Sequence, residues 1–500
     1  MSTAQTPSSG RSVFTGALQG TVLYSIPLLG QRLASILLLS IVTRVLTRDD
    51  FGMLSLIDQV TIVVTLLLCG NFSSSLGYFY FRENSEIGRA RVIGTTLLGA
   101  LLLGSLAAVI CWPAMGMLAR YVFRSPDALR YLPIALITMP FSFGVEALSG
   151  WLRVEDRQAA FAKISLLRIA LTVAGIVVLV GVLRMRVMAY LSTALYTTVV
   201  VAAVMTVYLF RTLRPRLSVD LFVRMFYFSV PIGLSMVAMF IINFGDQFVL
   251  RHYRSLAEVG IYALAYRIGM MVAVAYSSFQ AYWSAQVYQI LQREDADIVF
   301  ARLFTYVVLV LSLLTLVLTL GAAPGMRILV AADFRVATPL IPVIAAANAI
   351  RNAGEFLRYR FLAAGRPGYK TYCDWAGLAV CLVLYFLLIP RYGMWGGAIA
   401  TMGTFVAMGV ISVVTTYWMS PYRVEGARLL KLGGVLALIM ILYYAVPVSS
   451  LTLQIGWSAA LLALFPAGLW ALRFPTPGER EIMRSAVQRI AGWRYGASNA

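Results

Sequence analysis

The segment DFGMLSL at residues 50–56 has a counterpart 208 residues later, EVGIYAL at residues 258–264. Both follow the pattern acidic, apolar, Gly, apolar, any residue, small, Leu, and both open an apolar run. Upstream of each lies a serine-apolar-proline triplet, SIP at 25–27 and SVP at 229–231. The acidic residue suits the positive end of a helix dipole, and the glycine permits a tight turn or close contact between helices. The recurrence predicts two related halves in one chain.

The composition around this repeat is that of a membrane protein. Of the 500 residues, 60% are hydrophobic and 12% are charged, and the mean hydropathy is +0.82. Soluble domains contain about 45–50% apolar and about 25% charged residues. At about 20 apolar residues per crossing, the chain is expected to cross a bilayer on the order of a dozen times. Little of it is left for soluble domains.

Apolar runs between charged residues predict fourteen membrane-spanning helices. They are expected at 16–43, 52–78, 92–118, 131–151, 161–182, 187–210, 227–250, 259–288, 303–326, 336–361, 371–390, 393–418, 429–448 and 454–472. Only the short uncharged stretch VPVSSLTLQ separates the last two, so twelve or thirteen spans remain as alternatives.

The predicted fold is therefore an all-α polytopic membrane protein with about fourteen transmembrane helices. Six spans separate the two copies of the repeat, an even number, so a pseudo-two-fold axis along the membrane normal is expected to relate the halves. Two facing six-helix bundles enclose a cavity, which is the architecture of alternating access. The expected parts are a cytoplasmic tail 1–15, an N-terminal six-helix half 16–210, a linker 211–226, a second six-helix half 227–418, an extra helix pair 427–472 and a basic amphipathic cytoplasmic tail 473–500.

The net charge of +20 predicts an orientation rather than a nucleic-acid site, because the basic residues are dispersed among short loops. With the N-terminus inside, 26 basic residues fall on the cytoplasmic side and 12 on the opposite side, as the positive-inside rule requires. Both termini are therefore expected in the cytoplasm. In the last segment, Ile482, Val487 and Ile490 recur at helical spacing among arginines. This favours a helix on an anionic membrane surface, with a solvated end as the alternative.

Residue types that carry enzymatic or metal chemistry are sparse. His252 is the one histidine, and the four cysteines lie in apolar surroundings without metal-ligand or redox spacing. No predicted loop is long enough for a catalytic domain, and the adjacent Asp49 and Asp50 do not form a DxD-type site. We expect no enzyme activity, no metal and no cofactor, apart from an H⁺ or Na⁺ gradient.

Three stretches resemble a known family: LTRDDFGMLSLIDQV (46–60), YFSVPIGLSMVAMFIINFGDQFVL (227–250) and AEVGIYALAYRIGMMVAVAYSSFQAYWSAQVY (257–288). They are similar to the polysaccharide exporters and O-antigen-type oligosaccharide flippases of the multidrug/oligosaccharidyl-lipid/polysaccharide superfamily. The resemblance implies turnover of a polyprenyl-pyrophosphate-linked oligosaccharide across a bacterial inner membrane, for O-antigen or exopolysaccharide synthesis. It also implies membrane lipids, a polymerase and glycosyltransferases as partners.

Arginines predicted at bilayer depth are the candidate substrate ligands. An ionisable group at the centre of a bilayer costs at least about 2.5–3.5 kcal/mol, so it is a functional candidate by default. Arg32, Arg267 and Arg351 are the basic residues predicted well inside spans. A guanidinium stays charged and can grip a pyrophosphate bidentately. The alternative is structural pairing with carboxylates, Arg351 with Glu355, Arg267 with Asp246 and Arg32 with Asp58.

Carboxyl groups at depth are candidates for ion coupling or gating. They are Asp246, Asp58, Glu146 and Glu355. Burial favours the protonated form of a carboxyl group, so Asp246 or Glu146 could take up and release a proton between states. The alternative for Asp246 is a helix-packing network with its polar neighbours on the same span.

The paired prolines Pro27 and Pro231, one in each half, are the candidate hinges, because a proline within a helix frees a backbone carbonyl and permits a bend.

Two other function classes remain as alternatives. An ion-coupled drug/cation antiporter of the same superfamily should have an acidic, aromatic cavity with few arginines. A membrane glycan polymerase or transferase should carry acids or histidines on a sizeable loop. The arginines at depth and the short loops disfavour both, and a non-transporting scaffold or scramblase is left open.

Overall fold

The structure is a computed structural model that describes residues 38–69, 72–290, 294–364, 366, 368–419, 425–446, 448 and 450–476. Every regular element in these ranges is helical, and no strand occurs among them. Most of the first predicted span (16–43), the tail 1–15 and residues 477–500 lie outside the described residues.

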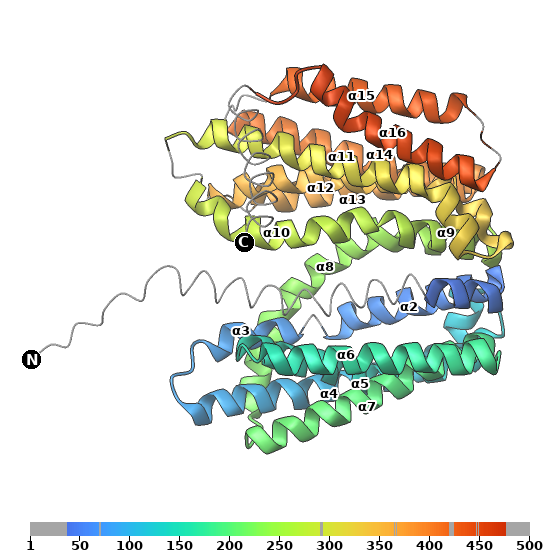
Figure 1. Ribbon diagram of the computed structural model, residues 1–500. Coiled ribbons are helices and arrows are strands. Elements are labelled where there is room, and N and C mark those ends of the chain that lie inside the picture. Colours follow the sequence, from blue (N-terminus) through green and yellow to red (C-terminus); the bar gives the residue numbers. More distant parts are fainter. Residues whose placement is uncertain are drawn as a thin grey trace, which may run out of the picture. The chain divides into compact units, whose positions relative to one another are not determined.

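The helices follow the predicted spans (Figure 1). They are α2 (Arg48–Cys69), α3 (Ser75–Tyr80), α4 (Glu86–Met117), α5 (Ala128–Val154), α6 (Gln158–Gly175), α7 (Arg186–Thr212), α8 (Val219–Tyr253), α9 (Leu256–Gly269), α10 (Met271–Ile290), α11 (Ala296–Leu329), α12 (Leu340–Ala363), α13 (Gly368–Tyr392), α14 (Met394–Met419), α15 (Gly426–Ala445) and α16 (Leu451–Ala471). Two 3-10 turns are η1 (Phe72–Ser74) and η4 (Ala332–Ala337), and two π-helical turns are η2 (Leu118–Phe123) and η3 (Ile176–Val182).

Two predicted spans differ in detail from the helices. The span 259–288 is divided into α9 and α10, and the span 52–78 into α2, η1 and α3. The last two predicted spans are separate helices, α15 and α16, as the fourteen-helix count requires.

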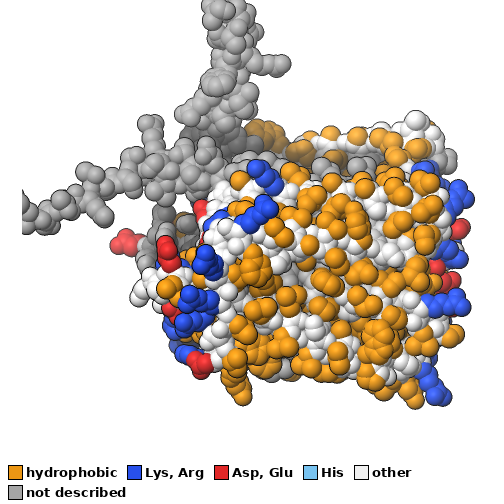
Figure 2. All heavy atoms as spheres, turned by 90° about the horizontal axis from the view of Figure 1, so that it is seen from below, with side chains coloured by type: hydrophobic (Ala, Val, Ile, Leu, Met, Phe, Trp, Pro, Cys, Tyr) orange, Lys and Arg blue, Asp and Glu red, His pale blue; other side chains and the backbone are white. Residues whose placement is uncertain are grey.

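The helices have the length and surface of membrane spans. Among the described residues, eleven helical segments are long and apolar enough to cross a membrane, or twelve if the two bent parts of α8 count as one span. Figure 2 shows a face covered largely by hydrophobic side chains, with Lys and Arg gathered toward its two ends. The predicted all-α polytopic fold is confirmed. Helix α12 is not among the eleven, and it is the helix that carries Arg351, Glu355, Arg358 and Arg360.

Helix α8 is bent. Its parts Val219–Pro231 and Met236–Tyr253 are inclined by 53° to one another. A proline lacks the amide hydrogen of the helix ladder and clashes with the preceding turn, which accounts for a bend at Pro231. Movement about this point stays a prediction.

The chain forms two compact units. The first comprises Met1–Leu264, Leu329–Ala337 and Leu378–Thr401, and the second comprises Ala265–Ile328, Thr338–Gly377 and Met402–Ala500. In the first, α4, α5 and α7 pack around a core that includes the buried Trp151 and Leu97.

The second unit has two apolar clusters. In one, the ring of Trp283 on α10 stacks on that of Phe356 on α12, with centroids 4.5 Å apart. In the other, α11, α15 and α16 pack around Ile439 and Phe465.

The two copies of the sequence repeat meet within the first unit. Gly52 is at the start of α2 and Gly260 at the start of α9. A β-carbon placed on Gly52 would lie 3.1 Å from the backbone nitrogen of Gly260, and one placed on Gly260 would lie 2.9 Å from that of Gly52. The nearest atom to each is a carbonyl oxygen four residues before the other glycine, of Leu256 and Arg48 respectively. The contact is reciprocal, and only glycine permits this approach.

Both copies begin with the same helix cap. The hydroxyl of Thr47 accepts the amide hydrogen of Asp50 at 3.3 Å, and the hydroxyl of Ser255 accepts that of Glu258 at 3.2 Å. Each is a Ser/Thr-x-x-acid sequence, which is the signature of a helix N-terminus. The offset of 208 residues found in the sequence therefore holds for the caps as well as for the glycines.

The acid of each cap contacts the start of another helix at the same offset. Asp50 forms an ion pair of 2.6 Å with Arg186, the first residue of α7. Glu258 accepts the backbone amide hydrogen of Met394, the first residue of α14, at 2.7 Å. The internal repeat is thus a repeat of tertiary contacts.

Candidate functional site

Asp246 on α8 is a buried carboxyl group in the first unit. Its side chain has no exposed surface. The hydroxyl of Tyr262 on α9 donates to its Oδ2 atom at 2.5 Å, and the hydroxyl of Thr401 on α14 donates to the same atom at 3.2 Å. Its Oδ1 atom is buried without a hydrogen-bond partner in the described part of the chain. Three helices therefore meet at one carboxyl group that is only half satisfied.

The polar neighbours of Asp246 each contact a different partner. Gln247 accepts a hydrogen bond from Ser55 on α2 at 2.6 Å. Asn243 donates to the carbonyl of Met239 in its own helix at 2.5 Å. The side chains of Asn243, Asp246 and Gln247 therefore bond to separate partners. Of the three, Asp246 has a carboxyl oxygen without a hydrogen-bond partner in the part of the chain that is described.

Within the described ranges, the unpartnered Oδ1 atom of Asp246 is an acceptor that a proton could occupy. A buried acceptor without a partner costs about 1–3 kcal/mol, and a proton on Oδ1 changes a bare acceptor into a neutral hydroxyl group. Among the described residues, no group of three or more His, Cys, Asp or Glu side chains gathers in a way that could hold a metal ion. The oxygen donors of Asp246, Tyr262 and Thr401 comprise one carboxyl group and two hydroxyls.

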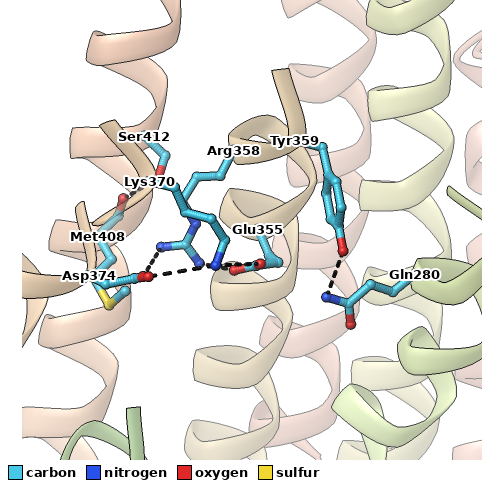
Figure 3. A network of polar contacts seen from close by, with 8 residues as sticks. All are labelled: Gln280, Glu355, Arg358, Tyr359, Lys370, Asp374, Met408 and Ser412. Atoms are coloured by element: carbon cyan, nitrogen blue, oxygen red, sulfur yellow. Dashed lines mark hydrogen bonds and ion pairs between the residues drawn. The ribbon is translucent and has the colours of Figure 1, made fainter. Parts of the chain in front are cut away.

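Helix α12 and the first turns of α13, both in the second unit, carry a network of four charges in which Arg358 is buried and the other three side chains are partly buried (Figure 3). Arg358 is 1% exposed and forms ion pairs with Glu355 and, at 3.2 Å, with Asp374. Lys370 lies 3.6 Å from a carboxylate oxygen of each acid. Two cations face two anions, so the network is neutral, as burial of charges requires.

Next to the network, a side-chain hydrogen bond joins α12 to α10. The amide of Gln280 donates to the hydroxyl of Tyr359 at 3.2 Å, as Figure 3 shows. Arg351, one turn before Glu355, is half-buried and its guanidinium carbon lies 5.6 Å from the centroid of the Phe405 ring. This geometry is within the range of a cation–π interaction.

The other predicted residues are spread over the fold. Arg267 is exposed in the last turn of α9, and Asp58 is exposed on α2. Glu146 is exposed on α5 and lines a pocket of about 400 Å³. Arg32 and Pro27 lie outside the described residues. The predicted roles of all these side chains stay predictions.

Several polar residues of these clusters were missed from the sequence. The charge count places Arg358 and Lys370 among the basic residues of the cytoplasmic side, whereas Arg358 is inside α12 and buried. The same count includes Arg168, which lies ten residues into α6. The spacing of Glu355 with Arg358 and of Lys370 with Asp374, three and four residues, was the available signal. No signal indicated Tyr262 or Thr401 as partners of Asp246.

Comparisons with known proteins agree with this architecture. Residues 17–282 match the family model described as polysaccharide biosynthesis protein. A solved structure of the lipid II flippase MurJ, in an inward closed conformation, is similar with a TM-score of 0.73 and 12% identity over 90% of this chain and 99% of the other.

Two transporters of the MOP superfamily are also similar. An inward-facing multidrug resistance MATE family transporter gives a TM-score of 0.64 and 16% identity, over 80% of this chain and 97% of the other. A transporter from Pyrococcus furiosus, with a binding pocket described as reversed in polarity, gives 0.53 and 16% over 80% and 94%. No curated protein sequence matches. At these identities, the likeness to solved structures concerns the fold.

Proposed function

The chain belongs to the family of polysaccharide biosynthesis proteins, and we propose that it is a flippase for polyprenyl-pyrophosphate-linked saccharide units. The observation that carries the proposal is the family match over residues 17–282. The fold supports it, because it is shared with a lipid II flippase and with multidrug transporters. The saccharide units would be destined for a surface polysaccharide, O-antigen or exopolysaccharide.

Buried arginines are the chemistry that such a cargo needs. A pyrophosphate is an anion that has to cross a medium of low dielectric constant, and guanidinium groups keep their charge there. Arg351 is half-buried on α12, next to a network in which Arg358 is already matched by Glu355 and Asp374. We propose Arg351 as a ligand of the pyrophosphate, together with Arg267 and Arg32.

Asp246 is the proposed site of ion coupling. Its half-satisfied carboxyl group is suited to hold a proton in the conformation described by the structure. Release of that proton in another conformation would leave a charged carboxylate, which must then be exposed to water or lie beside a cation. Because Asp246 and the bend at Pro231 belong to the same helix α8, proton binding would shift the balance between two shapes of that helix. Asp58, Glu146 and Glu355 remain proposed as further coupling or gating groups.

In this proposal the protein works by alternating access in a bacterial inner membrane, with both termini in the cytoplasm. The cargo would be taken from the cytoplasmic leaflet after the glycosyltransferases that assemble it, and delivered to a polymerase on the other side.

A reconstituted flipping assay tests the proposal. The full-length protein is placed in liposomes with a fluorescent undecaprenyl-pyrophosphate-linked oligosaccharide, and the fraction accessible to a membrane-impermeant quencher is followed in time. We expect the wild type to exchange the lipid between leaflets and Arg351→Gln to slow this at least about ten-fold, the loss expected for a charged hydrogen bond. Arg366→Gln, which removes an exposed charge from the loop after α12, is the matched control. No exchange by the wild type would refute the flippase assignment.

A drug/cation antiporter is the second candidate, because the fold is shared with multidrug transporters and Asp246 is a buried acid. The same liposomes loaded with ethidium distinguish the two. Proton-driven ethidium exchange without lipid exchange would favour the antiporter.

A further inference from the structure

A pocket of about 400 Å³ lies between α5, α6 and α7 in the first unit. It extends from the end of the helices near the α5–α6 loop, where it is lined by Arg153 in the last turn of α5 and Phe161 in the first turn of α6. By the distribution of basic residues this is the cytoplasmic end. The pocket contains none of the residues proposed above as pyrophosphate ligands.

Two of its charged side chains lie deep. Arg168 is ten residues after the first residue of α6, and Glu146 is eight residues before the last residue of α5. At 1.5 Å per residue these positions are about 15 Å and about 12 Å from the helix ends, so an arginine and a glutamate line the pocket at similar depth. Among the residues that the structure describes, no ion pair holds Glu146, Arg153 or Arg168.

The rest of the lining is rich in hydroxyl groups. On α5, Ser142, Glu146, Ser149 and Arg153 follow one another at intervals of four, three and four residues, which places them on one face of the helix. Ser165 adds a hydroxyl from α6. A polar stripe therefore runs from the mouth of the pocket about halfway into a membrane helix, where polar and charged groups are costly unless they serve a function.

These groups match two parts of one ligand. Guanidinium groups that are not engaged by carboxylates are suited to a phosphate, which they can bind with two parallel hydrogen bonds. Serine hydroxyls and a carboxylate, by contrast, accept and exchange hydrogen bonds with alcohol groups. A simple anion would use the two arginines but would leave Glu146 and the serines without a partner on the ligand. A simple cation would use Glu146 but would leave the two arginines without one.

We propose that this pocket binds the head group of a membrane lipid in which a phosphate is linked to a polyol. Arg153 and Arg168 bind the phosphate, and Glu146 with the serines binds the hydroxyl groups. Two sources have this chemistry: a phosphatidylglycerol of the bilayer, and the sugar-pyrophosphate head of the cargo. Only the second source rests on the proposed function.

Native mass spectrometry of the full-length protein tests the site. The protein is mixed separately with dioleoyl-phosphatidylglycerol, with dioleoyl-phosphatidylcholine, which has a phosphate but no polyol, and with undecaprenyl-pyrophosphate-linked N-acetylglucosamine. We expect phosphatidylglycerol, the lipid-linked sugar or both to bind at least about ten-fold more tightly than phosphatidylcholine, as charged hydrogen bonds predict.

Variants assign the binding to the pocket. Arg168→Gln should remove most of this preference, and Glu146→Gln should weaken the polyol lipid while sparing binding of dioleoyl-phosphatidic acid, which carries a phosphate alone. Lys163→Gln removes an exposed charge from the same helix but does not line the pocket, so it should bind as the wild type does. Should Arg168→Gln fail to fold, Ser165→Phe fills the pocket without changing its charge, and should also abolish the preference.

The outcomes separate the possibilities. Tight binding of phosphatidylglycerol alone identifies a bilayer lipid, and tight binding of the lipid-linked sugar alone identifies the cargo. Equal binding of phosphatidylcholine, or equal losses in Lys163→Gln and Arg168→Gln, overturns the proposal. Because the readout is binding, the site can fail while lipid exchange persists, or stand while the flipping assay fails.

Discussion

Gly52 and Gly260 pack directly against one another at the beginnings of α2 and α9, and a β-carbon added to either would lie about 3 Å from the backbone nitrogen of the other. The approach is symmetric, because the neighbouring carbonyls belong to Arg48 and Leu256, four residues earlier in each copy. Backbone on both sides leaves no flexible side chain that could move away.

We therefore expect Gly52→Ala and Gly260→Ala each to destabilise the fold by about 1–3 kcal/mol, the usual cost of overpacking. Thermal unfolding in detergent, followed by fluorescence-detected size exclusion, measures the loss. Gly116→Ala in α4 is the matched control, because nothing lies within 4 Å of its added β-carbon. A loss in the control equal to that in Gly260→Ala would contradict the packing argument.

The caps of both copies should contribute to stability, and the Thr47 cap should contribute more, because its hydroxyl also accepts a hydrogen bond from Arg186 at 3.0 Å. Thr47→Ala and Ser255→Ala each remove a hydroxyl that accepts an amide hydrogen at the first turn of a helix. The expected cost is about 1 kcal/mol at Ser255 and larger at Thr47, again read from thermal unfolding. Thr138→Ala removes a hydroxyl that bonds only within its own helix and should cost less. A loss at Ser255→Ala no larger than that at Thr138→Ala would contradict the capping role.

Arg358 should be indispensable to the second unit for reasons of charge. Arg358→Met leaves Glu355 and Asp374 near each other, with only Lys370 beside them. Breaking a buried ion pair in this way costs about 3–5 kcal/mol, so a large fall in the unfolding temperature is expected. The combined variant Arg358→Met, Glu355→Leu and Asp374→Leu removes all but one charge and should recover part of the loss. Failure of the triple variant to exceed Arg358→Met would argue against a charge effect.

Asp246→Asn separates the structural role of this residue from ion coupling. Asparagine keeps the shape and can still accept hydrogen bonds from Tyr262 and Thr401, but it cannot lose a proton. We expect a folded protein whose transport no longer responds to an imposed pH difference in liposomes. Asp127→Asn, at an exposed position just before α5 where the side chain makes no cap hydrogen bond, is the control and should keep the response. If transport by Asp246→Asn still followed the pH difference, another group would be the proton carrier. Dependence of the wild type on Na⁺ instead of pH would exclude proton coupling altogether.

The helices could be predicted from the sequence because each span is a continuous apolar run, which is a local property. The repeat was visible for the same reason, since its motif occupies seven consecutive residues in each copy. Even so, the division between α9 and α10 near Met270 was missed, because the hydropathy of the span continues across it.

The partners of the buried polar groups could not be predicted. Asp246 and Thr401 are 155 residues apart, and nothing local relates them. Arg358 is not among the arginines predicted at depth, because hydropathy counts the charge on one helix and not the carboxylate of Asp374 on the next. Burial of a charge depends on neutralisation by neighbours in three dimensions, which a single helix does not reveal.

An interval of 208 residues separates both Gly52 from Gly260 and Arg186 from Met394. From the glycine to the start of the later helix there are 134 positions in both copies. This equal spacing is what an internal duplication would leave if no net insertion or deletion followed between these points. In the first copy, Asp50 forms an ion pair with the side chain of Arg186. In the second copy, the longer side chain of Glu258 accepts the backbone amide hydrogen of Met394. Natural relatives are therefore expected to vary in length outside residues 52–186 and 260–394. Within these ranges they are expected to replace the side-chain ion pair by the bond to a backbone amide, or the reverse.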